Sequence, residues 1–257
     1  MAWVEVRRDG AVGVVTLNKP PVNALDAGFL GEIEAAVAEL EGDEDVRAVV
    51  FRSGIPGIFI AGADIKAFED AGATEAAIGA FHNCFSHIER LPKPTIAAIG
   101  GHALGGGCEF ALACDFRLMV DDGRSRIGLP EVNLGLFPGA GGTQRLPRIV
   151  GEARALDIIL HGRRLSAPEA LAIGLVHETA APEAFDAAVL EYARRLAEGP
   201  TRALAAAKAL VRQALSVPLA EGLQAERQAF LAILNTDDAR EGVRAFLEKR
   251  QPTFRGR

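Results

Sequence analysis

Apolar and polar residues follow two different periods along the first half of this chain. They alternate over residues 3–7 and 11–17, which predicts two strands with one buried face each, and Asp9-Gly10 between them is a strong hairpin signal. Beyond Asp26, which can cap a helix, apolar residues recur every three or four positions. Short, mainly apolar runs then predict buried strands at residues 46–51, 95–99 and 116–120.

Helical periodicity dominates the second half. A capping-box signal stands at residues 166–169. Apolar spacing predicts helices at residues 183–198, 202–215, 219–234 and 238–248. Because the earlier strands are separated by helices, such as one over about 73–90, the fold class is predicted to be α/β. We expect a core domain over residues 1–200 and a C-terminal helical oligomerisation region over residues 201–257.

One segment between the predicted strands carries an unusual carboxylate. The glycines 105–107 lead into the apolar run 108–114, which holds Glu109 near its start and predicts a buried helix. Adjacent glycines indicate a tight bend or a close backbone approach, and the first turn of a helix offers free N–H groups. These features suit a site that stabilises an oxyanion and moves a proton. Alternatively, the glycines only permit close packing and Glu109 is a solvated charge.

A second carboxylate, Glu131, lies in a predicted loop rich in glycine and proline over residues 128–147. Pro130 restricts the backbone before it, and its apolar neighbours favour the protonated form that a general acid requires. An ion pair with Arg145 or Arg148 is the alternative role.

A third segment, Ala61-Gly-Ala-Asp64, places small residues where a loop of residues 53–64 meets a helix start. Its backbone N–H groups could supply another oxyanion donor, whereas a helix cap by Asp64 is the alternative.

Composition and missing motifs narrow the possible functions. The chain is 49% hydrophobic and 24% charged, which argues against disorder, and its net charge of −6 disfavours nucleic acid or an anionic membrane as a partner. The three cysteines include no CxxC pair, so we expect reduced thiols in a reducing compartment. No apolar run approaches the length of a membrane span and no N-terminal apolar segment follows basic residues, so we expect a soluble cytoplasmic protein. P-loop, dinucleotide-binding and nucleophile-elbow motifs are missing, and the five histidines have no metal-ligand spacing. No metal site is therefore predicted.

Four segments together resemble the crotonase superfamily, most closely its enoyl-CoA hydratases. They are residues 61–66, 101–109, 130–146 and 246–250, which occur in family order. The resemblance implies a crotonase-like spiral of repeated ββα units with a C-terminal helical trimerisation region. It also implies a homotrimer or a hexamer built as a dimer of trimers.

The resemblance also implies roles for individual residues. The N–H groups of Ala63 and Gly106 would form an oxyanion hole, and Glu109 and Glu131 would be the acid–base pair. The residues implied in binding the substrate are Ala24, Ala61, Asp64, Ile65, Lys66, Leu104, Gly105, Pro130, Phe246 and Lys249, the last two reaching the ligand of a neighbouring subunit. Ala67 stands where relatives often carry glutamate, so the preferred acyl-chain length is not predicted.

The implied reaction is hydration of trans-2-enoyl-CoA to 3-hydroxyacyl-CoA, as in fatty-acid β-oxidation. Coenzyme A is part of this substrate, and the resemblance implies no separate cofactor. Two alternatives remain. A Δ3,Δ2-enoyl-CoA isomerase of the same superfamily needs only one base, and the presence of both Glu109 and Glu131 favours the hydratase. A non-catalytic acyl-CoA-binding protein would bind the thioester without turnover.

Overall fold

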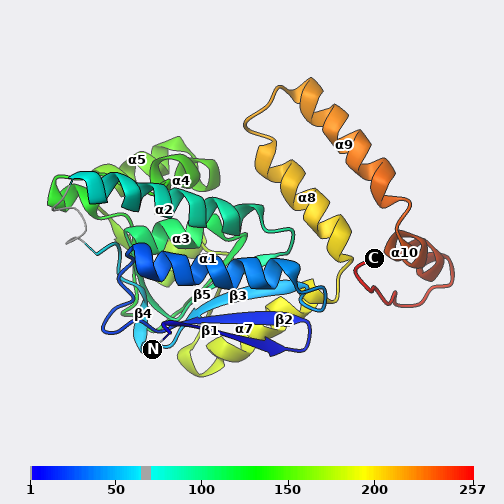
Figure 1. Cartoon of the computed structure of the whole chain (residues 1–257), viewed down its shortest axis with the longest axis horizontal. Coiled ribbons are helices and arrows are strands. Elements are labelled where there is room, and N and C mark those ends of the chain that lie inside the picture. Colours follow the sequence, from blue (N-terminus) through cyan, green and yellow to red (C-terminus); the bar gives the residue numbers. More distant parts are fainter. Residues whose placement is uncertain (1, 65–70) are drawn as a thin grey trace.

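Two mixed sheets form the frame of the computed structural model, which describes residues 2–64 and 71–257 (Figure 1). In order across the larger sheet, the strands are β1 (Val4–Asp9), β2 (Val12–Leu17), β3 (Ala48–Ser53), β5 (Thr95–Ile99), β7 (Phe116–Val120) and β10 (Glu178–Ala180). Those of the smaller sheet are β4 (Gly57–Ile60), β6 (Gly101–Leu104), β8 (Ile127–Gly128) and β9 (Arg164–Leu165). The pairs β1–β2 and β8–β9 are antiparallel, and the others are parallel.

A ββα unit recurs along the chain. The strands β3 and β4 precede helix α2 (Ala71–Arg90), and β5 and β6 precede helix α3 (Gly106–Ala113). In each unit the first strand joins the larger sheet and the second joins the smaller one, as β7 and β8 do again. This arrangement confirms the predicted α/β spiral of ββα units.

Helices cover both faces of the larger sheet (Figure 1). Helices α1 (Ala27–Gly42), α2 and α3 pack on one face, and α7 (Pro182–Ala197) packs on the other. At the centre, the Phe110 ring of α3 makes edge contacts with Phe51, Phe59 and Phe85, at centroid distances of 5.2, 5.9 and 5.6 Å. These contacts fix α3 against both sheets and against α2.

Local sequence signals account for the N-terminal elements. Gly10 forms the turn of the β1–β2 hairpin with a φ of 60°, in the left-handed region that glycine adopts without strain. Asp26 caps α1, because its Oδ1 accepts a hydrogen bond of 2.8 Å from the Phe29 N–H. The capping box predicted at residues 166–169 is also present, at the start of α6 (Ala167–Ala172).

Two segments expected to be loops contain regular structure, so those predictions were wrong. Residues 53–64 include β4, and residues 128–147 include the 3₁₀ helix η2 (Glu131–Leu134) and the start of α4 (Gly142–Val150). Helix α5 (Glu152–Leu160) follows directly. Helix α3 packs so closely on the end of β4 that only glycine fits at position 107. A Cβ on Gly107 would lie 2.1 Å from the Ile60 carbonyl oxygen.

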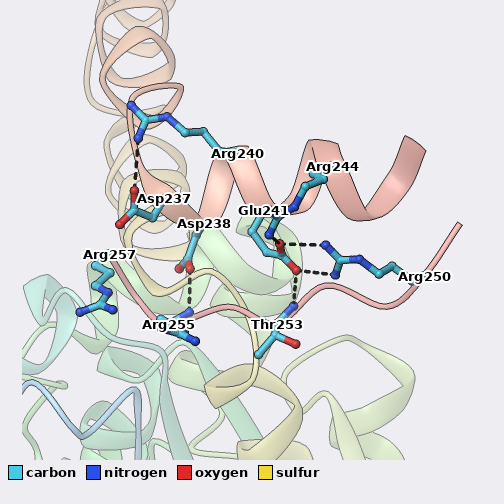
Figure 2. A pocket seen from close by; sticks show the side chains of 9 residues that line it. All are labelled: Asp237, Asp238, Arg240, Glu241, Arg244, Arg250, Thr253, Arg255 and Arg257. Atoms are coloured by element: carbon cyan, nitrogen blue, oxygen red, sulfur yellow. Dashed lines mark hydrogen bonds and ion pairs between the residues drawn. The ribbon is translucent and has the colours of Figure 1, made fainter. Parts of the chain in front are cut away.

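The C-terminal helices α8 (Thr201–Gln213), α9 (Leu219–Ile233) and α10 (Asp237–Leu247) follow the predicted ranges and extend away from the sheets (Figure 1). The last residues return along α10 (Figure 2), where the buried Asp238 carboxylate accepts hydrogen bonds from the Arg255 and Gly256 N–H groups. A cavity of about 610 Å³ beside them is lined by Asp237, Asp238, Arg240, Glu241, Arg244, Arg250, Thr253, Arg255 and Arg257.

Large apolar side chains are exposed along this helical region. They are Val211, Leu215, Leu219, Leu223, Phe230, Leu231, Leu234, Val243, Phe246 and Leu247. Apolar surface of this kind is typical of a protein–protein interface. The domain boundary near residue 200 and the oligomerisation role stay predictions. Within residues 2–64 and 71–257, no helix combines the length and apolar character that crossing a membrane requires.

Candidate active site

Glu109 lies in the first turn of α3, and only 3% of its surface is exposed. Its Oε1 accepts hydrogen bonds from two backbone N–H groups, those of Ala140 at 2.7 Å and Gly142 at 2.8 Å. Burial raises the pKa of Glu109 above its ordinary value, whereas the two hydrogen bonds from backbone N–H groups and the positive charge of Arg145 oppose that rise. The alternative of a solvated surface charge is therefore wrong.

Glu131 opens η2 directly after Pro130 and is half-buried. Its Oε2 is buried and has no hydrogen-bond partner among the residues that the structure describes. The pKa of Glu131 rises to about 7, mainly because of burial. A backbone hydrogen bond lowers this pKa, and the negative charge of Glu109 raises it. The influence of one carboxylate on the other places both in a common electrostatic environment.

The alternative ion pair for Glu131 is not formed. Arg145 pairs instead with Glu89, at 2.8 Å, and Arg148 donates a hydrogen bond to the Gln144 carbonyl oxygen of its own helix. Glu131 thus remains a carboxyl group without a cationic partner in the described part of the chain.

Two backbone N–H groups lie beside the carboxylates. Ala63 forms a parallel bridge with Leu25, in which the Leu25 N–H bonds to the Gly62 carbonyl and the Asp64 N–H bonds to the Leu25 carbonyl. The Ala63 N–H therefore points away from Leu25. It lies next to Gly106, whose Cβ, if present, would be 3.4 Å from the Ala63 nitrogen. Neither N–H has an acceptor among the described residues.

The smaller sheet brings these amides together. Residues 61–63 follow the end of β4 and residues 105–106 follow the end of β6, and these strands are parallel neighbours. Their carboxyl ends therefore meet at one edge of the sheet. Gly105 has a φ of 54°, and a Cβ there would lie 3.2 Å from Glu131 Oε1. The Glu131 carboxyl group therefore packs against the backbone of Gly105.

Several residues predicted to bind the substrate surround this edge. The Ala61 N–H donates to the Val22 carbonyl, and the Ala24 carbonyl accepts from Lys19 Nζ at 2.9 Å. The Gly105 N–H donates to the Gly128 carbonyl, which joins β6 to β8. Ala24, Ala61, Asp64, Leu104 and Pro130 are all half-buried.

Of the four remaining predicted residues, two lie away from this cluster and two are not described. Ile65 and Lys66 lie outside the residues that the structure describes. Phe246 is on α10 and is 83% exposed, and the exposed Lys249 follows that helix with a φ of 54°. Figure 1 shows α10 well apart from α3, so within one chain they do not join Glu109.

The support of Glu109 by the loop before α4 was not predicted. A Cβ on Gly142 would lie 3.1 Å from Glu109 Cγ and 2.8 Å from Pro138 Cβ, so only glycine fits without displacing a neighbour. The available signal was the Gly-Ala-Gly-Gly run at residues 139–142. Such a run permits a tight backbone path around a buried group.

Comparison with known proteins identifies relatives of the whole chain. The family model described as Enoyl-CoA hydratase/isomerase matches residues 7–257. A protein of Rhizobium meliloti (strain 1021), named probable enoyl-CoA hydratase, is 40% identical over 253 residues, which cover 98% of this chain and 97% of the relative. The human enoyl-CoA hydratase domain-containing protein 2, mitochondrial, is 40% identical over 258 residues, with coverage of 97% and 87%.

Solved structures agree with these sequence matches. The crystal structure of an enoyl-CoA hydratase from Geobacillus kaustophilus HTA426 superposes with a TM-score of 0.96 at 36% identity, covering 100% of this chain and 98% of the other. That of the Bacillus anthracis enoyl-CoA hydratase gives 0.94 at 36% identity, with coverage of 99% and 100%. The likeness thus extends over both the sheets and the C-terminal helices.

Proposed function

Because this chain belongs to the enoyl-CoA hydratase/isomerase family, we propose that it hydrates trans-2-enoyl-CoA thioesters to 3-hydroxyacyl-CoA products. One observation carries the proposal: the buried Glu109 and the half-buried Glu131 lie beside two backbone N–H groups that have no acceptor among the described residues. Hydration of a conjugated thioester requires a base, an acid and stabilisation of a developing oxyanion, and this cluster offers all three.

The backbone donors bind the reacting carbonyl. The thioester oxygen accepts hydrogen bonds from the Ala63 and Gly106 N–H groups, and these donors stabilise the negative charge that develops on it. This polarisation withdraws electron density from Cβ, where the nucleophile adds. Gly106 is the first residue of α3, so the positive end of the helix dipole adds to the stabilisation.

The glutamates move the protons. As the oxygen of water attacks Cβ, Glu109 accepts a proton from that water. Both backbone hydrogen bonds to Glu109 are made to Oε1, which leaves Oε2 for this transfer. Glu131 gives a proton to Cα, and the carbon–carbon double bond becomes single. A pKa of about 7 keeps a substantial fraction of Glu131 protonated at neutral pH, as a general acid requires.

The test is a panel of trans-2-enoyl-CoA thioesters of increasing chain length, followed by the loss of absorbance of the conjugated thioester. We expect turnover of at least part of the panel, and losses of ~10²–10⁴-fold in kcat for Glu109→Gln and Glu131→Gln. Binding of acyl-CoA without turnover of any thioester would instead identify a non-catalytic acyl-CoA-binding protein. Full activity in either variant would remove that residue from the mechanism.

A Δ3,Δ2-enoyl-CoA isomerase is the second candidate, because Glu131 Oε2, which has no hydrogen-bond partner in the part of the chain that the structure describes, could by itself carry a proton between two carbons. Offering 3-enoyl-CoA and 2-enoyl-CoA to the same preparation separates the two reactions. Faster turnover of the 3-enoyl thioester, together with an unaffected Glu109→Gln variant, would favour the isomerase.

We also propose a homotrimer or a dimer of trimers in the cytoplasm. The exposed apolar side chains of α8 to α10 support assembly, and three free buried cysteines suit a reducing compartment. In this assembly, Phe246 and Lys249 would reach the coenzyme A of a neighbouring subunit, and Ala24, Ala61 and Asp64 would line its path. Sedimentation equilibrium gives the subunit number directly.

A further inference from the structure

Arg145 of α4 lies behind the loop that supports Glu109, and only 12% of its side chain is exposed. Its Nε and Nη2 donate to Glu89 Oε2 of α2, at 3.1 and 2.8 Å. Its Nη1 donates to the Ala140 carbonyl oxygen, at 3.1 Å. The planar guanidinium therefore joins α2 to the loop before α4 with three directed bonds.

The same loop holds Glu109. Ala140 accepts a hydrogen bond from Arg145 at its carbonyl oxygen and donates one to Glu109 from its N–H. The next residue, Gly141, has a φ of 110°, and a Cβ there would lie 2.2 Å from Arg145 Nη1. The guanidinium is thus packed directly on the backbone that places the Ala140 and Gly142 amides.

We propose that Arg145 is a positioning residue for Glu109, holding the loop of residues 139–142 so that two amides grip Oε1 and orient the carboxylate. This inference rests on the proposed function for its kinetic consequence. Arg145 touches no reacting atom, and its influence passes through the backbone of Ala140 and through its positive charge.

A second arginine, Arg212, binds the other oxygen of the Glu89 carboxylate. Glu89 Oε1 accepts a hydrogen bond of 3.2 Å from Arg212 Nη1, and Arg212 belongs to α8 of the C-terminal region. Arg212 Nη2 also donates to Asp115 Oδ1 and to the Cys114 carbonyl at the end of α3, both at 3.0 Å. Glu89 therefore sits between two arginines, and α8 is joined to the loop that supports Glu109.

The charges around Glu109 make the effect measurable. Among the described residues, the titratable groups that face it are Glu131 of η2, Arg145 of α4 and the neighbouring Cys108 thiol of α3. Burial raises the pKa of Glu109, and Arg145 is the cation that opposes the rise. Removing this cation raises the pKa of Glu109 further. In a plot of kcat/KM against pH, the decline on the acid side, where Glu109 is protonated and cannot act as a base, therefore moves to higher pH; we call this decline the acid limb.

The experiment compares Arg145→Met and Arg145→Lys with the control Arg148→Met. Arg148 lies on the same helix, is exposed, and bonds only within α4 in the described part of the chain. For Arg145→Met we expect a ~10²-fold loss of kcat with little change in KM, as misplacement of a catalytic group produces. Arg145→Lys keeps the charge, so the acid limb should stay in place while kcat recovers in part.

Crystal structures of the same variants supply a readout that does not depend on activity. We expect both hydrogen bonds to Glu109 Oε1 to be absent in Arg145→Met and present in Arg148→Met. Retention of both bonds in Arg145→Met, or a kcat and an acid limb equal to those of Arg148→Met, would overturn the inference. A wild-type protein without hydratase activity would refute the proposed function instead, and the crystal structures would still decide the role of Arg145.

Discussion

Replacing Glu131 by glutamine should stabilise the fold at alkaline pH while it removes the proposed acid. Burial raises the pKa of Glu131 from an ordinary value of 4.5 to about 7. At 1.36 kcal/mol for each pKa unit, holding this group ionised in the folded protein costs up to ~3 kcal/mol. Glu131 is only half-buried, and solvent screening reduces the expected gain to about 1–3 kcal/mol.

The sign of the effect follows from proton binding. The folded state holds the Glu131 proton more tightly than the unfolded state, so wild-type stability falls as pH rises from 4.5 to about 7. Below this range the group is protonated in both states, and above it the full cost is present. Glutamine is neutral throughout, so the advantage of Glu131→Gln should be small at pH 5 and reach its full size at pH 8.

Urea denaturation of both proteins at pH 5 and pH 8, at equal protein concentration, measures this difference. Glu191→Gln, at an exposed position of α7, is the matched control and should show no such pH-dependent gain. The same preparations should show the catalytic loss, together with a wild-type kcat/KM that declines above about pH 7 as Glu131 ionises. A stability difference that does not vary with pH would refute the electrostatic reasoning.

Three further predictions concern other parts of the molecule. Glu109→Gln should lower kcat by ~10²–10⁴-fold and retain calorimetric binding of an acyl-CoA product, whereas loss of binding would indicate a role in affinity. Gly107→Ala places a Cβ 2.1 Å from the Ile60 oxygen and should lower the free energy of unfolding, measured by urea denaturation, by ~1–3 kcal/mol. Its control Gly31→Ala, in open space on α1, should stabilise by ~0.5–1 kcal/mol. Leu223→Glu, at a side chain that is 54% exposed, should reduce the subunit number in sedimentation, and an unchanged assembly would exclude that face.

The elements with strong local signals were predictable from the sequence. The hairpin at Gly10, the cap at Asp26 and the long helices depend on contacts within a few residues, so their residue types reveal them. The strands β8 and β9 are two residues long, which is too short for any alternation to be visible. Their partners are distant in the chain, and only the assembled smaller sheet defines them.

Helix α4 was hidden for a different reason. Pro147 lies inside it, and proline usually marks the end of a helix. The helix forms because Gly142, Leu146 and Val150, spaced four residues apart, bury one face. Arg145 was considered only as a partner of Glu131, and its actual partner, Glu89, lies 56 residues earlier in the chain. Ion pairs of such separation follow from the fold and have no local signature.

The candidate carboxylates themselves were predictable because a charge in an apolar or glycine-rich segment is unusual. Their surroundings were not, since the amides of Ala140 and Gly142 carry no residue-specific mark. Backbone groups are present at every position, and only the path of the chain decides which of them converge.

That property of the backbone has an evolutionary consequence for the strand ends after β4 and β6. Under the proposed mechanism, the groups that polarise the thioester belong to the polypeptide itself, and among the residue types only proline, which has no N–H, would remove them. A descendant that preserves these neighbouring strand ends inherits the capacity to stabilise an enolate. New reactions of acyl thioesters can therefore emerge on this frame through changes at positions 109 and 131 alone.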